Sequence, residues 1–184
     1  MSLASESELA RRAASGDQAA FAELVRLHQQ AVYNVAYRML GNPSDAEDAT
    51  QDAFIRAYHF FDRFDLDRPL APWLKRIAVN VCLNRLKTDK PASFLDDDLP
   101  PPKDPHPGPE LQTAARQQKE RIRAEIIRLP PRYRAVIELR HFQELSYDQI
   151  ARALNRPRSD VKSDLFRARK LLAERLKDLK YEPS

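Results

Sequence analysis

Apolar residues recur every three or four positions along most of the chain, which is the spacing of amphipathic helices. The pattern predicts a short helix over residues 6–15 and a longer one that Asp17 caps and that runs to about Leu40, where a Gly-Asn-Pro sequence stops it. A further helix is expected after Ser44, which with Glu47 forms a capping-box pattern, and another near Pro72, which suits a first helical turn. Alternation with period two is too short everywhere to predict a strand. The sequence therefore predicts an all-α fold.

A proline-rich stretch divides this helical pattern. Residues 91–109 hold seven of the fourteen prolines and an acidic run of three aspartates. Such a segment has little to bury and is expected to be an extended linker, at about 3.1 Å per residue where it is polyproline-like. We therefore predict two small helical domains, residues 1–88 and 110–180, joined by a flexible linker at 89–109.

Residues 145–172 have the pattern of a helix-turn-helix. Ser146 and Gln149 form a capping box, Asn155 suits a turn with positive φ, and Pro157 prevents the first helix from continuing. The second helix has a narrow apolar face of Val161, Leu165, Ala168 and Leu172. Its opposite face carries Lys162, Ser163, Phe166, Arg167 and Lys170. This basic, partly aromatic face predicts contact with DNA, and the alternative is a packed helix pair with a solvated basic face.

An acidic face is predicted on the helix that follows Ser44. Its members are Asp45, Glu47, Asp48, Gln51 and Asp52. Acids on neighbouring turns repel one another and do not stabilise a helix. The face is therefore interpreted either as an ordinary solvated surface or as a docking site for a basic protein surface.

A polar stripe runs along the helix predicted over residues 72–87. It consists of Arg76, Asn80, Asn84 and Lys87. Asparagine can read base edges, and arginine or lysine can hold phosphates. Trp73 belongs either to the core or to a surface that stacks on an unpaired base. The stripe is thus a second candidate surface for nucleic acid, with a solvated helix face as the alternative.

The charges are segregated along the chain although the net charge is only +4. Residues 45–67 carry a net charge of −5, whereas residues 68–90 and 155–177 each carry +5. This segregation indicates different partners for different stretches. Cys82 is the only cysteine, which excludes an internal disulfide and favours a reducing compartment.

Several classes of function find no support in the sequence. The four histidines have no metal-ligand spacing, no glycine-rich phosphate loop occurs, and no catalytic arrangement of side chains is recognisable. We therefore expect neither a metal nor a cofactor, and no enzymatic activity. The absence of a signal-peptide core or a long apolar run predicts a cytoplasmic protein without membrane insertion.

Together these stretches resemble the extracytoplasmic-function (ECF) group of bacterial sigma factors. The sequence DAEDATQDAF resembles their region 2.2, which grips the β′ clamp helices of core RNA polymerase. The sequence WLKRIAVNVCLNRLK resembles regions 2.3 and 2.4, which open and read the −10 promoter element. The sequences LPPRYRAVIELRHF and LSYDQIARALNRPRSDVKSDLFRAR resemble region 4, which meets the β flap and reads the −35 element. An anti-sigma partner is also implied by the resemblance.

The resemblance assigns a role to each candidate surface. It implies that Asp45, Glu47, Asp48, Gln51 and Asp52 contact polymerase. It implies that Phe64, Trp73, Arg76, Asn80, Asn84 and Lys87 handle the −10 strand, and that Lys162, Ser163, Phe166, Arg167 and Lys170 meet the −35 duplex. The chain departs from the family pattern at Ser159-Asp160 and at Asp164, where acids stand on a helix expected to approach phosphate. The alternative function is a free-standing helix-turn-helix regulator, which does not need the acidic helix.

Overall fold

The computed structural model describes residues 3–88 and 114–178. The described elements are α1 (Leu3–Ala14), α2 (Gln18–Leu40), α3 (Pro43–His59), η1 (Phe61–Arg63), α4 (Leu70–Thr88), α5 (Ala114–Ile127), α6 (Pro131–Ile137), η2 (Glu138–Phe142), α7 (Tyr147–Leu154) and α8 (Arg158–Arg175). No strand occurs within these ranges, which confirms the all-α prediction. The predicted linker lies outside the described residues, and the exact domain boundaries stay a prediction.

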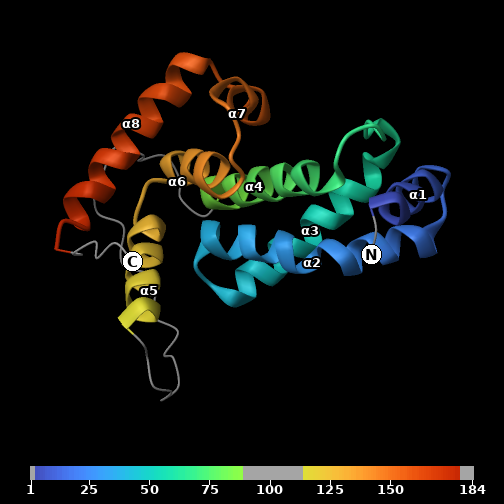
Figure 1. The fold of residues 1–184 in the computed structure, drawn as a ribbon, viewed down its shortest axis with the longest axis horizontal. Coiled ribbons are helices and arrows are strands. Elements are labelled where there is room, and N and C mark those ends of the chain that lie inside the picture. Colours follow the sequence, from blue (N-terminus) through green and yellow to red (C-terminus); the bar gives the residue numbers. More distant parts are fainter. Residues whose placement is uncertain (1–2, 89–113, 179–184) are drawn as a thin grey trace.

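The N-terminal domain, α1–α4, is organised around α2. This helix packs against α1, α3 and α4, which lie around it in Figure 1. Its buried face includes Val35, Ala36 and Met39, which are fully enclosed. Burying a valine or methionine side chain stabilises the fold by about 1.5–3 kcal/mol. The bundle thus places the outer face of α3 toward solvent, whereas α4 also packs against α6.

The ends of α2 are as the sequence predicts, but the start of α3 is not. Asp17 caps α2 by accepting from the Ala20 amide at 3.0 Å, and Gly41 ends the helix at φ 77°. Ser44 does not cap α3. The Asn42 side chain accepts from the Ser44 amide at 2.8 Å and Pro43 opens the helix, so the capping-box prediction is wrong. With Asn42 as the cap, Pro43 falls at the first helical position, where its missing amide would have had no partner within the helix.

The C-terminal domain, α5–α8, is built on α6. This short helix packs against α8 and continues into η2, a π-helix of five residues. The chain then turns into α7 and α8, which form the predicted helix-turn-helix; α7 lies at the top of Figure 1 and α8 runs down its left side. The predicted capping box is confirmed, since Ser146 and Gln149 bond each other's backbone amides. Asn155 ends α7 at φ 50°, as predicted.

The two domains share a continuous set of buried apolar residues. Ile127 of α5 lies against Gly41, where an added Cβ would come within 3.1 Å of the isoleucine side chain. The positive φ at position 41 therefore favours glycine, and a larger residue there would also require the Ile127 side chain to shift. No helix within the described ranges has the length and apolarity needed to cross a membrane.

Candidate functional site

The acidic face of α3 is exposed. Ala46, Ala49 and Ala53 point into the core and turn the intervening residues outward. Asp45, Glu47, Asp48 and Gln51 are exposed, and Asp52 is half-buried. The structure therefore brings the five predicted residues together on one surface of the N-terminal domain.

The residues of the polar stripe on α4 differ in their exposure to solvent. Asn84 and Lys87 are exposed near the end of the helix, whereas Arg76 and Asn80 are half-buried. The Asn80 Nδ2 donates to the Arg76 carbonyl at 3.1 Å and to the Ala153 carbonyl of α7 at 3.2 Å. The predicted stripe is thus continuous on the helix but only partly open to solvent.

The aromatic residues before α4 form a packed cluster. The rings of Phe64 and Trp73 lie 5.0 Å apart, and Phe61 lies within 5.8 Å of both. Phe64 is 8% exposed and Trp73 is half-buried. In this cluster Phe61 and Phe64 belong to the core, and Trp73 is partly exposed to solvent.

The outer face of α8 is basic and open. Val161, Leu165 and Ala168 are buried against the domain. Lys162, Arg167 and Lys170 are exposed, Ser163 is half-buried, and Phe166 is 70% exposed. A single exposed apolar side chain is common on protein surfaces, so Phe166 is of interest only because cations surround it on this face. The outer face of α8 thus presents three cations and one aromatic ring to solvent.

Comparison with protein families assigns both domains. Residues 24–91 match the family model for sigma-70 region 2, and residues 119–172 match that for sigma-70 region 4. The ECF RNA polymerase sigma factor SigW of Bacillus subtilis (strain 168) is 37% identical over 177 residues, which cover 89% of this chain and 92% of SigW. This chain belongs to the ECF sigma factors. It binds core RNA polymerase and directs promoter-specific initiation of transcription.

Other relatives agree with this assignment of the sigma factor. The ECF RNA polymerase sigma-E factor of Escherichia coli (strain K12) is 32% identical over 180 residues, which cover 93% of this chain and 94% of that protein. The solved structure of CnrH in complex with the cytosolic domain of CnrY matches with a TM-score of 0.63 and 29% identity, over 96% of this chain and 99% of CnrH. The alternative of a free-standing regulator is therefore not supported.

The acidic face of the sigma factor contains an ion pair that its sequence does not reveal. Arg85 of α4 pairs with Asp52 of α3, and its other terminal nitrogen lies 4.0 Å from Asp48. The hydrogen bond that Arg85 donates to the Asp52 carboxylate raises the pKa of Arg85 above its usual value. These positions are more than thirty residues apart, and helical periodicity alone cannot pair them. Part of the negative charge of α3 is therefore neutralised within the molecule.

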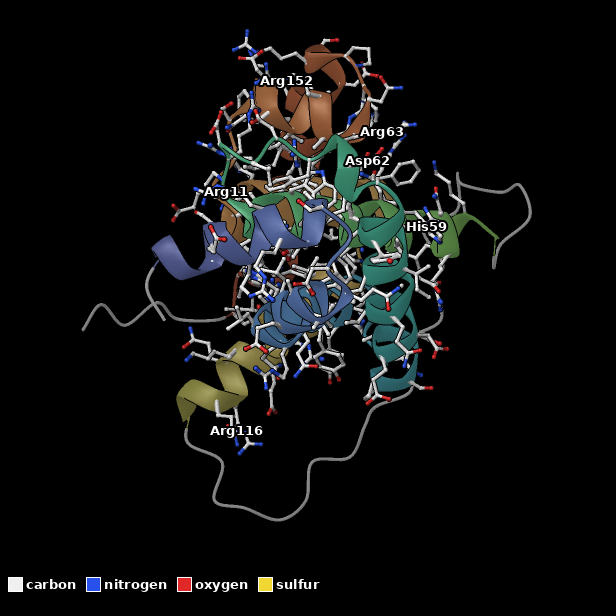
Figure 2. The ribbon with its side chains drawn as sticks, turned by 90° about the vertical axis from the view of Figure 1, so that its right-hand side faces the viewer. Arg11, His59, Asp62, Arg63, Arg116 and Arg152 are labelled. Carbon is white, nitrogen blue, oxygen red and sulfur yellow. The ribbon has the colours of Figure 1, made fainter. Side chains whose placement is uncertain are left out.

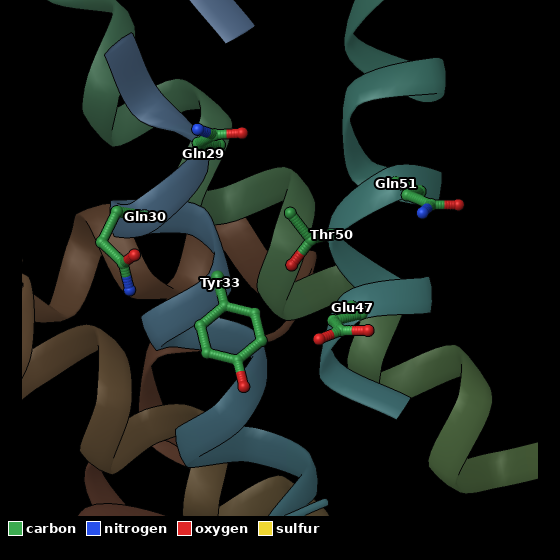
Figure 3. A pocket seen from close by; sticks show the side chains of 6 residues that line it. All are labelled: Gln29, Gln30, Tyr33, Glu47, Thr50 and Gln51. Carbon is green, nitrogen blue, oxygen red and sulfur yellow. The ribbon is translucent and has the colours of Figure 1, made fainter. Parts of the chain in front are cut away.

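A polar groove borders the acidic face (Figure 3). Gln29, Gln30 and Tyr33 of α2 line one side, and Glu47, Thr50 and Gln51 of α3 line the other, around a volume of about 410 Å³. Burial, with Tyr37 and Glu47 nearby, raises the pKa of Tyr33. The α2 residues could not be identified from the sequence, because their spacing fits the exposed side of any amphipathic helix. The groove extends the exposed polar surface beyond α3.

Arg156 forms ion pairs with Asp160 and Asp164, the two acids of α8 that depart from the family pattern. Its guanidinium lies 2.6 Å from a carboxylate oxygen of Asp164 and 3.7 Å from one of Asp160. Asp164 is 4% exposed, and Arg132 of α6 lies 3.9 Å from its other oxygen. Asp164 thus points into the domain, and its charge is directed away from the outer face of α8. Figure 2 shows the helix-turn-helix with Arg152 of α7 labelled.

Proposed function

We propose that the sigma factor divides its work among three helix faces. The acidic face of α3 docks on the β′ clamp helices of core polymerase, the exposed side of α4 with Trp73 handles the −10 strand, and the outer face of α8 reads the −35 duplex. The observation that carries this proposal is the opposite charge of two well-exposed faces, acidic on α3 and basic on α8. DNA attracts the second and repels the first, so the first requires a protein partner.

The residues of each face have distinct tasks in this proposal. Asp45, Glu47, Asp48, Gln51 and Asp52 contact polymerase. The −10 strand is handled by Trp73, Arg76, Asn80, Asn84 and Lys87. Phe64 packs against the Trp73 ring and supports it. Lys162, Ser163, Phe166, Arg167 and Lys170 meet the −35 duplex, where cations hold phosphates and Phe166 reaches an apolar group such as a thymine methyl.

The proposed sigma factor supplies specificity and no catalysis of its own. Polymerase forms the phosphodiester bonds, so the protein acts in the cytoplasm beside that enzyme. We also propose an anti-sigma partner that holds the protein inactive. Its support is the solved complex of CnrH with the cytosolic domain of another protein, CnrY, because CnrH is similar to this chain over nearly its whole length.

Charge reversal on α3 tests the docking face. Asp48→Lys with Asp52→Lys is expected to weaken binding to the organism's own core polymerase by at least about tenfold, which is the size of effect seen when close charge pairs across an interface are lost. Affinity is measured by fluorescence anisotropy of the labelled sigma factor titrated with core enzyme. Unchanged affinity would refute the docking role.

Two controls separate docking from folding. Asp48→Asn with Asp52→Asn removes the acids without placing lysines against Arg85, and it should weaken binding by a smaller factor. Glu8→Lys with Asp178→Lys makes the same change in net charge at two exposed acids outside the face, and it should leave affinity near that of the parent. Equal losses in the reversal and in this control would show that total charge, not the α3 face, determines binding.

A further inference from the structure

One of the two acids near the start of α8 remains on the outer face of the helix. Asp160 stands in the first turn, and its side chain is 48% exposed. Residues three and four positions apart lie on one line along a helix, so Asp160 shares a line with Ser163 and Arg167. Asp164, in contrast, is turned into the domain. Asp160 is therefore an exposed acid at the N-terminal end of the face proposed to read the −35 duplex.

The Asp160 carboxylate is held in place and can still accept hydrogen bonds. The Ser159 hydroxyl donates to one of its oxygens at 3.3 Å, and the Arg156 guanidinium lies 3.7 Å from the other. Arg156 is bound more closely to Asp164, at 2.6 Å. An ionised carboxylate offers about four acceptor sites, so each oxygen of Asp160 can take a further hydrogen bond. The side chain is thus positioned for a ligand that donates one.

The phosphates of DNA are not that ligand. Phosphate oxygens accept hydrogen bonds and carry the same charge as the carboxylate, so Asp160 repels them. The cations of the outer face can hold phosphates instead. In a helix-turn-helix, the N-terminal residues of the second helix contact base edges in the major groove. A base edge is therefore the part of DNA that an acid at this position can meet favourably.

Two bases offer a hydrogen to a carboxylate in the major groove. Cytosine presents its N4 amino group and adenine its N6 amino group, whereas the N7 and O6 of guanine and the O4 of thymine only accept. Adenine also has its N7 acceptor beside the amino group, and that lone pair repels a carboxylate. Cytosine has no acceptor of its own on this edge, so it is the better partner. Guanine and thymine are disfavoured, because their acceptor atoms would face the charge of the acid.

We propose that Asp160 is a specificity-determining residue, which accepts a hydrogen bond from the N4 amino group of a cytosine in the −35 duplex. The inference rests on the proposed role of α8 and adds a base preference to it. Arg156 and Ser159 are positioning residues that hold the carboxylate toward the groove. An acid in the first turn also stabilises a helix through the helix dipole, but that role alone gives no preference for a base.

Selection of DNA by the holoenzyme tests this preference. Core polymerase of the same organism, loaded with the full chain, is mixed with duplex DNA randomised over both promoter elements, and the bound sequences are counted. At one position of the −35 element the parent should favour cytosine about tenfold over guanine or thymine, the size of one good contact to a base. Asp160→Ala should lose this preference and keep those at the other positions. Asp160→Asn should shift it to adenine, because an amide both accepts from N6 and donates to N7.

A matched control separates base reading from charge. Asp178→Asn removes the same charge from an acid of the same domain that is 61% exposed and lies beyond the end of α8, and it should leave the selected sequences unchanged. If both Asp160 variants select the same bases as the parent, the inference is overturned, even where affinity for all sequences rises through lost repulsion from phosphate. Asp160→Asn preserves the shape of the side chain, so it keeps the test valid if Asp160→Ala loosens the first turn.

Arg167→Ala distinguishes failure of this inference from failure of the proposed function. If the parent selects no −35 sequence and Arg167→Ala binds the pool as the parent does, the proposed role of α8 fails and the inference fails with it. If Arg167→Ala weakens selection of the −35 element but the Asp160 variants keep the base preferences of the parent, only the inference fails. A parent that selects a −35 element without the cytosine also overturns the inference alone.

Discussion

Two helices of this sigma factor carry the same local pattern of charge and use it differently. Asp48 and Asp52 on α3, like Asp160 and Asp164 on α8, are acids spaced four residues apart, and one arginine contacts both members of each pair. On α3 the two carboxylate side chains are 62% and 45% exposed. On α8, the Asp164 side chain is only 5% exposed, whereas that of Asp160 is 48% exposed.

Because of this difference in burial, the two ion pairs are expected to contribute differently to stability. An exposed ion pair contributes about 0–1 kcal/mol to stability, because water and salt screen it. Breaking a buried pair costs about 3–5 kcal/mol, because a charge is left without a partner. Arg156 is therefore expected to hold the turn of the helix-turn-helix against α8, whereas Arg85 chiefly adjusts the charge that α3 presents to a partner.

The largest effect is expected from removing the arginine of the buried pair. Arg156→Met leaves Asp164 enclosed with only Arg132 at 3.9 Å. The free energy of unfolding should fall by about 2–3 kcal/mol, less than the full cost because the Arg156 side chain is 29% exposed. Urea unfolding followed by circular dichroism measures this change. Arg158→Met is the matched control, since Arg158 and Asp148 are both more than 60% exposed, and its effect should stay within about 0.5 kcal/mol.

Equal effects of these two substitutions would remove the distinction between the α8 and α3 pairs. If Arg158→Met lowers the free energy of unfolding as much as Arg156→Met does, burial of Asp164 does not make its ion pair more important for stability than an exposed one. Stability and promoter recognition must be compared separately, because a loosened turn also displaces the outer face of α8.

A smaller effect is expected from the outer face of α8 itself. Arg167→Ala removes an exposed cation without touching the buried pair, so stability should be unchanged. Transcription from a promoter that depends on its −35 element should fall about tenfold, the value of one good contact to a base or phosphate. Run-off transcription with purified core polymerase measures this, with a promoter lacking the −35 element as the control. Equal output from both promoters, for parent and variant, would contradict the assignment of α8.

The sequence predicts those features of the fold that depend on neighbours along the chain. The capping box at Ser146 and the left-handed Asn155 follow from residue chemistry within one turn, and both are confirmed. The helix-turn-helix and the outward faces of α3 and α8 follow from periodicity. The predicted cap at Ser44 is wrong because Asn42 offers an equally good side chain two residues earlier.

Contacts between distant residues could not be predicted in this way. Nothing in the local pattern distinguishes Asp164 from Asp52, since only the position of Arg156 and the packing of α6 bury the first. The pairs Arg85–Asp52 and Arg38–Glu138 join residues 33 and 100 positions apart. Asn80 illustrates the consequence for a candidate site. Its place on the polar stripe is predictable, but its bond to the α7 backbone depends on how the two domains meet.

The smallest effect is expected from Arg85→Gln, on the rate of association with core polymerase. This substitution also tests most directly whether the two ion pairs differ in role. The substitution makes the α3 face more negative by one charge, because Asp52 and Asp48 lose their internal cation. Association with a basic protein surface should then be about twofold faster at low salt and unchanged at high salt, where exposed charges are screened. Stopped-flow fluorescence with core polymerase measures the rate, and Arg26→Gln supplies the same change in net charge elsewhere. Slower association would mean that Arg85 holds the two acids in position for docking, as Arg156 holds Asp164, and the two pairs would then have the same role.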